Sequence, residues 1–138
     1  MKFLIMIIAF AVMDACNAQH SEEVVEIVYK TYSRGSSLEM KVSPNQLVYK
    51  TRESESYTPL TSEQWKSLTL LCDEIALDKI KDFPAPSNRR WGDMAAHANL
   101  IILTEKGNYR SQTFDAGNPP EELLLLIKEL FEVAGIED

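Results

Sequence analysis

Apolar and polar residues alternate in the first third of the folded region in a way that is typical of half-buried β-strands. Residues 24–32 are rich in β-branched and aromatic side chains. After a turn, Leu38, Met40 and Val42 alternate with polar neighbours, which places them on one face of a strand. A Ser-Pro-Asn turn precedes residues 46–52, which return as a partner strand. The pattern predicts a β-hairpin.

A second stretch with a strand pattern lies in the C-terminal half. Proline and glycine interrupt the periodicity over residues 82–93, which indicates a loop. Residues 96–104 then resume an apolar strand pattern, and a turn at residues 105–108 leads into residues 109–114. We therefore expect a second β-hairpin.

Each expected hairpin is followed by a segment with the end signals of an α-helix. Thr61 and Gln64 have the spacing of a capping box at the start of the first helix. Asn118, followed by Pro119, is the expected N-cap of the second helix, and Gly135 marks its end. The inward face of the first helix is expected to carry Trp65, Leu68, Leu71, Cys72 and Ile75.

The two expected helix starts are offset by nearly the same distance as the hairpins before them. This spacing indicates a β-hairpin-plus-helix unit that is used twice. Because neither unit has enough apolar surface to stand alone, we predict one α+β domain. It has an antiparallel sheet of about four to five strands with two helices packed on one face, which leaves the other face for solvent or a partner.

The beginning of the chain has the organisation of a signal peptide. A positive charge at Lys2 precedes residues 3–13, which are apolar and uncharged. A transmembrane helix needs about 20 such residues, so this run is too short to span a bilayer. We expect residues 1–18 to be the signal segment, residues 19–23 a tether and residues 24–138 a single domain.

Two cleavage sites fit the signal segment. Cleavage before Cys16 follows a bacterial lipobox, in which the cysteine is lipidated, although Asp14 is an unusual residue for that motif. Cleavage after Ala18 follows ordinary signal-peptidase rules. The string CNAQ after a short apolar run resembles the start of many Bacteroidetes lipoproteins, which favours lipidation. We expect a protein that is lipid-anchored in the bacterial envelope, at the outer membrane, with a soluble periplasmic or secreted protein as the alternative.

Composition narrows the expected partners. The chain has 14 Lys and Arg residues against 21 Asp and Glu residues, a formal net charge of −7, so its field repels a phosphate backbone on average. We expect no nucleic-acid partner, and contact with the membrane only through a lipid anchor. Cys72 is the only thiol left once Cys16 is removed or lipidated. No intramolecular disulfide is therefore expected, and the apolar neighbours of Cys72 favour a core position.

Familiar catalytic and cofactor motifs are missing from the sequence. It has no P-loop and no CxxC, HExxH, GxSxG or GxGxxG string. Of the two histidines, His20 lies in the expected tether, and His97 alternates with small residues in a strand, where a surface position is favoured. We expect no metal site, no cofactor and no catalytic residue, and we do not expect an enzyme.

One loop is unusual in an acidic chain, because it places Arg89, Arg90, Trp91 and Asp93 close together. Guanidinium groups, an indole and a carboxylate can together hold carboxylates, phosphates or sugar rings. Asp115, in the loop before the second helix, can lie nearby. We predict that these five residues bind an unknown protein or a small anionic ligand. The alternative is structural, with the arginines neutralising acidic neighbours and the indole covering the sheet edge.

The repeated hairpin and helix, the P-x-x-R-R-W-G-D loop and the F-D-x-G-x-P-P-E-E-L helix start resemble small secreted domains found in Bacteroidetes. The resemblance covers residues 24–134. That family has no assigned activity or catalytic residues, so it implies a bacterial envelope protein and a two-unit sheet, and nothing about a substrate.

Three functions are compatible with these features. The first is a non-enzymatic binding or interaction module of the envelope. The second is a protein inhibitor of an extracytoplasmic hydrolase, in which a small rigid sheet presents one loop to the cleft of the enzyme. The third, and the least favoured, is an enzyme that uses only carboxylates such as Asp93 or Asp115.

Overall fold

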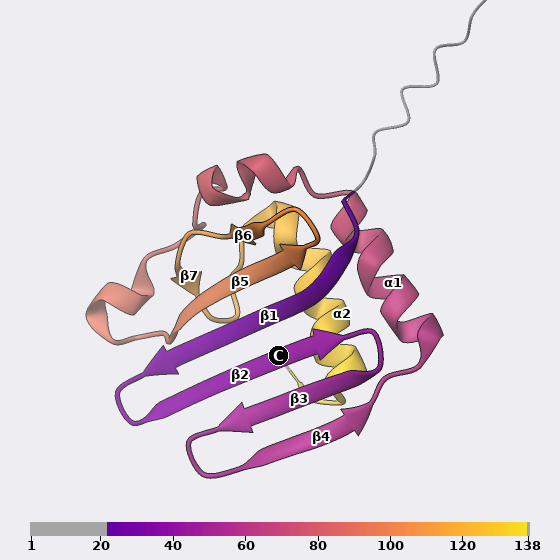
Figure 1. Ribbon diagram of the computed structural model, residues 1–138. Coiled ribbons are helices and arrows are strands. Elements are labelled where there is room, and N and C mark those ends of the chain that lie inside the picture. Colours follow the sequence, from indigo (N-terminus) through magenta and orange to yellow (C-terminus); the bar gives the residue numbers. More distant parts are fainter. Residues whose placement is uncertain (1–21, 138) are drawn as a thin grey trace, which may run out of the picture.

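The computed structural model describes residues 22–137 as an α+β domain with an open antiparallel sheet and two α-helices (Figure 1). The α+β class and the antiparallel sheet are therefore confirmed. The expected signal segment, the expected lipidation site Cys16 and the first part of the expected tether lie outside the described residues.

The sheet has seven strands, more than the sequence pattern predicted. Their bounds are β1 Val24–Ser33, β2 Ser36–Ser43, β3 Gln46–Thr51, β4 Glu55–Pro59, β5 His97–Thr104, β6 Asn108–Arg110 and β7 Phe114–Asp115. The strand order is β4, β3, β2, β1, β5, β6, and β7 pairs with β5 outside this path. The first four strands form a meander. Strand β5 then lies antiparallel to β1, so strands from the two halves of the chain pair inside the sheet (Figure 1).

Helix α1 spans Ser62–Asp73 and begins with the capping box that the sequence predicts. The Gln64 N–H donates to Thr61 Oγ1 at 3.1 Å, and the Thr61 N–H donates to Gln64 Oε1 at 2.9 Å. These bonds satisfy two backbone donors that have no partner inside the helix. Two 3₁₀ helices follow, η1 at Leu77–Asp82 and η2 at Arg89–Gly92.

Helix α2 spans Leu124–Ala134 and begins later than predicted. The 3₁₀ helix η3 at Glu121–Leu123 precedes it. The prediction that Asn118 is the N-cap is wrong, because the Asn118 side chain donates instead to Ser87 Oγ at 2.8 Å. The other end is as predicted, since Gly135 ends the helix with a φ of 68°, in the left-handed region that favours glycine.

One face of the sheet builds the core together with both helices. Ile27 of β1 lies beside Val42 of β2 and Ile102 of β5 on this face, and all three side chains are fully buried. Leu68 of α1 and Leu130 of α2 belong to the same buried cluster. Figure 1 accordingly shows α2 behind the sheet, with the opposite face of the strands turned toward the viewer.

The repeated hairpin-plus-helix unit is not confirmed. The first half supplies four strands, including β4, which the sequence pattern did not predict. In the second half the strand that returns beside β5 is interrupted, and only the short strands β6 and β7 remain. Between them, Ser111 Oγ accepts the Leu100 N–H at 3.0 Å, so a side chain replaces a backbone carbonyl in the ladder.

Candidate functional site

The carboxylate of Asp115 holds the Arg-Trp loop, residues 86–94, against the edge of the sheet. Asp115 lies in β7 and is only 1% exposed. Its Oδ2 accepts hydrogen bonds from Ser87 Oγ at 2.5 Å and from the Arg89 N–H at 2.8 Å, and its Oδ1 accepts the Arg90 N–H at 3.0 Å. Two of these donors are backbone groups, so the carboxylate fixes the path of the loop and not only one side chain.

The guanidinium of Arg90 forms an ion pair with the same carboxylate. Arg90 Nη1 lies 3.0 Å from Asp115 Oδ1, and both side chains are buried. Arg90 Nη1 also donates to the Ser87 carbonyl oxygen at 2.7 Å, which closes the loop on itself. Arg90 and Asp115 are therefore engaged with each other and with the loop backbone.

Burial and hydrogen bonding act in opposite directions on the acidity of Asp115. Burial alone would raise the pKa of this carboxyl, but hydrogen bonds from Ser87, Arg90 and Arg89 outweigh burial and hold the pKa well below its ordinary value. Asp115 is consequently an anion at neutral pH, with four donors already directed at its two oxygens. This arrangement suits a fixed structural anion better than a proton donor or acceptor in catalysis.

Other side chains of the Arg-Trp loop are turned to solvent. Trp91 is 74% exposed and Met94 is 68% exposed, which is unusual for large apolar residues. Arg90 Cζ lies 5.4 Å from the centroid of the Trp91 ring, a cation–π distance at which the guanidinium is attracted to the ring. Asp93 has a φ of 56°, and this left-handed turn lets the Met94 N–H reach the Arg89 carbonyl oxygen at 3.1 Å. The loop therefore has two parts. Its base, at Arg89 and Arg90, is hydrogen-bonded to Asp115, and its crest, formed by the Trp91 and Met94 side chains, is apolar and exposed.

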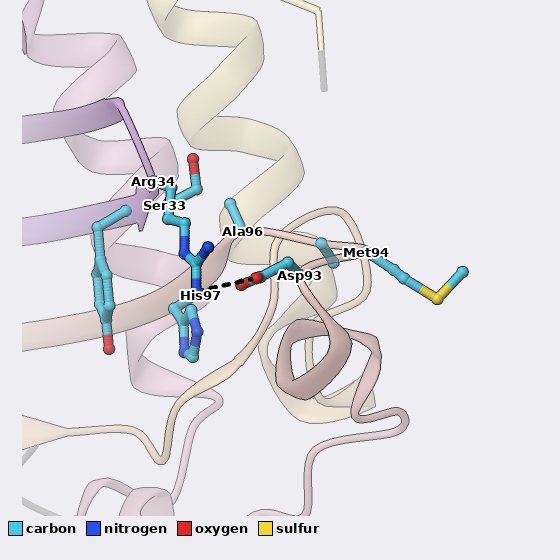
Figure 2. A pocket seen from close by; sticks show the side chains of 8 residues that line it. Ser33, Arg34, Asp93, Met94, Ala96 and His97 are labelled. Atoms are coloured by element: carbon cyan, nitrogen blue, oxygen red, sulfur yellow. Dashed lines mark ion pairs between the residues drawn. The ribbon is translucent and has the colours of Figure 1, made fainter.

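A surface hollow of about 600 Å³ lies beside this crest (Figure 2). It forms where the β1–β2 turn meets the end of the loop and the start of β5. Tyr32 and His97, which are direct neighbours across β1 and β5, stack with ring centroids 4.8 Å apart and an interplanar angle of 9°. The lining residues are Tyr32, Ser33, Arg34, Asp93, Met94, Ala95, Ala96 and His97.

Arg34 is the main positive group of the hollow. Its Nη2 lies 3.6 Å from Asp93 Oδ2, which is an ion pair but longer than a hydrogen bond. The Arg34 side chain is 91% exposed, and Figure 2 shows it extending across the hollow toward Asp93. Arg34 can therefore turn its donors toward an anion without breaking a hydrogen bond to Asp93.

The structure brings the five predicted site residues into one region and divides them into two groups. Arg90 and Asp115 are buried and paired, which matches the structural alternative for that arginine. Arg89, Trp91 and Asp93 remain exposed on the loop. Sequence reasoning missed Tyr32 and Arg34, because only the long-range pairing of β1 with β5 places the β1–β2 turn beside this loop.

Outside this site, the described residues include one thiol, Cys72, and no cluster of metal-binding side chains. Cys72 is 1% exposed, and burial raises the pKa of its thiol to about 12, so its predicted core position is confirmed and the thiolate is scarce at neutral pH. Residues 22–137 contain no group of three or more His, Cys, Asp or Glu side chains that could hold a metal ion. No helix in that range is both long and apolar enough to cross a membrane.

No protein-family model, curated protein or solved structure matches this chain. The fold and site define it as a small α+β domain with an open sheet, a fixed Arg-Trp loop and an adjoining aromatic hollow.

Proposed function

We propose that the protein is an exported, non-enzymatic binding module of the bacterial envelope, and that its recognition surface is the Arg-Trp loop with the neighbouring hollow. The partner is a protein or a small ligand that presents an anionic group. The observation that carries this proposal is the contrast between the fixed base of the loop and its exposed crest of Trp91 and Met94.

A loop that is already fixed loses less conformational entropy when a partner binds, so the entropic cost of binding is smaller. The loop backbone is bonded to Asp115 at Arg89 and Arg90, so it needs little ordering when a partner arrives. Tryptophan and arginine are the residue types that most often dominate binding energy at interfaces. An exposed Trp91 at the tip of such a loop is therefore best explained as an anchor for a partner.

The charges around the crest favour an anionic group on that partner. Arg34 and Arg89 are both exposed, whereas Arg90 is already neutralised by Asp115. A carboxylate or phosphate entering the hollow can take the place of Asp93 on Arg34 and accept two parallel hydrogen bonds. The Tyr32–His97 stack supplies a flat wall beside it for an apolar or ring-shaped part of the ligand.

Export and anchoring complete the proposal. The positive start, the short apolar run and the cysteine at position 16 support secretion followed by lipidation, and the resemblance to small secreted Bacteroidetes domains supports an envelope location. In this proposal Cys16 carries the lipid anchor, and cleavage after Ala18 to give a soluble protein remains the alternative.

Inhibition of an extracytoplasmic hydrolase is the second candidate. The observation that favours it is again the loop, since a short segment fixed by a buried ion pair and tipped by Trp91 has the form of an element that enters a cleft. The two functions differ in their partner, because an inhibitor forms a stoichiometric complex with one enzyme and stops its turnover.

Capture from native envelope extract tests the proposal. The mature chain is immobilised as wild type, as Trp91→Ala and as Leu125→Ala, the last being a control with a similarly exposed apolar residue on α2. We expect one partner to be retained by the wild type and the control. Loss of a central aromatic anchor costs about 2 kcal/mol or more, so Trp91→Ala should lower retention at least about tenfold.

Equal retention by all three proteins would place the recognition surface elsewhere and contradict the proposal. If the retained partner is a hydrolase, its turnover is measured with increasing amounts of the mature chain. A linear fall to zero at one equivalent identifies the protein as an inhibitor.

A further inference from the structure

The residues just before β1 are clamped to the sheet by a carboxylate. Glu22 accepts a hydrogen bond from Thr104 Oγ1 at 2.6 Å, and its two oxygens each lie 2.7 Å from the donating hydroxyl of Tyr109. The Glu105 N–H donates to the Glu23 carbonyl oxygen at 3.0 Å. Hydrogen bonds from Thr104 and then Tyr109 lower the pKa of Glu22, so the clamp is charged at neutral pH. Glu22 and Glu23 are therefore held against the sheet ahead of the first strand.

The Glu22 clamp and the recognition surface lie at opposite ends of the sheet. The clamp holds the start of β1 to the end of β5, whereas Tyr32 and Arg34 of the hollow lie at the end of β1 (Figure 1). A strand of ten residues is about 33 Å long. The clamp and the hollow therefore lie at opposite ends of β1, separated by about the length of that strand.

Only residues 17–21 lie between the proposed lipid anchor at Cys16 and the clamp at Glu22. Fully extended, the chain from Cys16 to Glu22 spans at most about 20 Å. Glu22 therefore stays within about 20 Å of the anchor, whereas β1 carries Tyr32 and Arg34 as much as about 33 Å farther along the strand.

From the clamp, the short tether and the strand direction, we infer that the lipidated protein stands with the Glu22 end toward the membrane and the Arg-Trp loop and hollow away from it. This inference rests on the lipidation in the proposed function. It identifies the lipid surface as the neighbour of the β5–β6 turn and of the first residues of the domain. The partner of the recognition surface then approaches from the aqueous side and is not a lipid of the same leaflet.

The overall charge of the protein does not draw the sheet onto an anionic bilayer. The protein has a formal net charge of −7, so an anionic membrane repels it on average. On the face opposite the helices, Lys30 and Lys41 both pair with Glu39, so this single carboxylate offsets one of their two positive charges.

The two tryptophans of the chain are natural reporters of this orientation. Trp65 lines a hollow together with Glu22 and Glu23, at the clamped end, whereas Trp91 is on the loop at the far end. The chain from Cys16 to Asp138 is coupled through the Cys16 thiol to vesicles of phosphatidylcholine that contain a maleimide lipid and a dansyl-headgroup lipid. Cys72 is buried and does not compete for coupling. Trp91→Phe leaves Trp65 as the donor, and Trp65→Phe leaves Trp91.

We expect energy transfer to dansyl to be greater from Trp65 than from Trp91 at the same dansyl content. Equal transfer would show a domain lying flat, and greater transfer from Trp91 would show the reverse orientation; either result overturns the inference. Cys16→Ser in each background reports transfer without attachment and is subtracted. Because coupling is chemical, this test succeeds or fails independently of lipidation in cells, which metabolic labelling tests separately.

Discussion

Arg90 and Asp115, which are 25 residues apart in the sequence, form a buried ion pair with Nη1 and Oδ1 3.0 Å apart. The neighbouring residue Arg89 contributes only its backbone N–H to the same carboxylate. Two adjacent arginines thus have different roles, one internal to the loop and one exposed. The difference can be measured by changing each of them separately.

Arg90→Ala is expected to destabilise the domain, whereas Arg89→Ala is not. Loss of the Arg90 side chain leaves a buried carboxylate with fewer donors, which costs about 1 to 3 kcal/mol. Arg89→Ala keeps the backbone bond, and exposed substitutions of this kind usually change stability by less than about 0.5 kcal/mol. Denaturant unfolding of both variants checks this. Equal midpoints for the two would show that the ion pair does not stabilise the loop.

The lowered pKa of Asp115 predicts a dependence of stability on acid. A carboxyl whose pKa is lower in the folded state than its ordinary value of 3.8 contributes stability that is fully present at neutral pH. That contribution declines as the pH falls below about 4, because the unfolded chain then binds a proton more readily than the folded one. We expect the difference in thermal midpoint between the wild type and Asp115→Asn to shrink as the pH is lowered from about 6 to about 2.5. These two values lie on either side of the ordinary pKa of an aspartate. A difference that does not change with pH would mean that the charge of Asp115 is not what holds the loop.

Core packing gives a third prediction. Leu68 and Leu130 are fully buried in the cluster shared by the sheet and the helices. Leu68→Ala or Leu130→Ala should lower the free energy of unfolding by about 2 to 5 kcal/mol, as cavity-forming changes do. Lys66→Ala, on the exposed side of α1, is the matched control and should change little. A loss of similar size for Lys66→Ala and Leu68→Ala would contradict the observed orientation of α1.

Lipidation is expected to depend on Cys16. Metabolic labelling with a palmitate analogue should mark the wild-type protein and not Cys16→Ser. Mature protein that begins at Gln19 in N-terminal sequencing would instead show ordinary cleavage after Ala18 and remove the basis for an anchored orientation.

The Glu22 clamp should be visible in hydrogen exchange. Glu22→Gln replaces one carboxylate oxygen, so the charge-assisted bonds from Thr104 and Tyr109 are weakened. We expect faster amide exchange at residues 23–26 and 103–106, with unchanged exchange in β2 and β3. Unchanged exchange at the clamp would indicate that the β1–β5 ladder alone orders this end of the domain.

Features that depend on neighbours in the sequence were predicted well. The capping box of Thr61 and Gln64 and the left-handed Gly135 are local devices, and the structure contains both. The core position of Cys72 followed from its apolar neighbours and is confirmed. Each of these rests on contacts within a few residues, which the sequence displays directly.

Features that depend on tertiary contacts were predicted less well. Asn118 has the sequence context of an N-cap, but its side chain bonds to Ser87, 31 residues away. Strand β4 was missed because its five residues include Glu55 and Pro59 and are all exposed, so no alternation of buried and exposed positions marks it. The hollow was missed for a similar reason, since the Tyr32–His97 stack exists only through the register of β1 with β5.

The exposed strand β4 also affects how readily the protein associates with other copies of itself. A strand at the open edge of a sheet offers unpaired backbone groups on which another chain can add a strand and begin aggregation. Here that edge is only five residues long, carries a charge at Glu55, and ends at Pro59, which has no N–H to donate. The edge is therefore a poor template for intermolecular sheet growth.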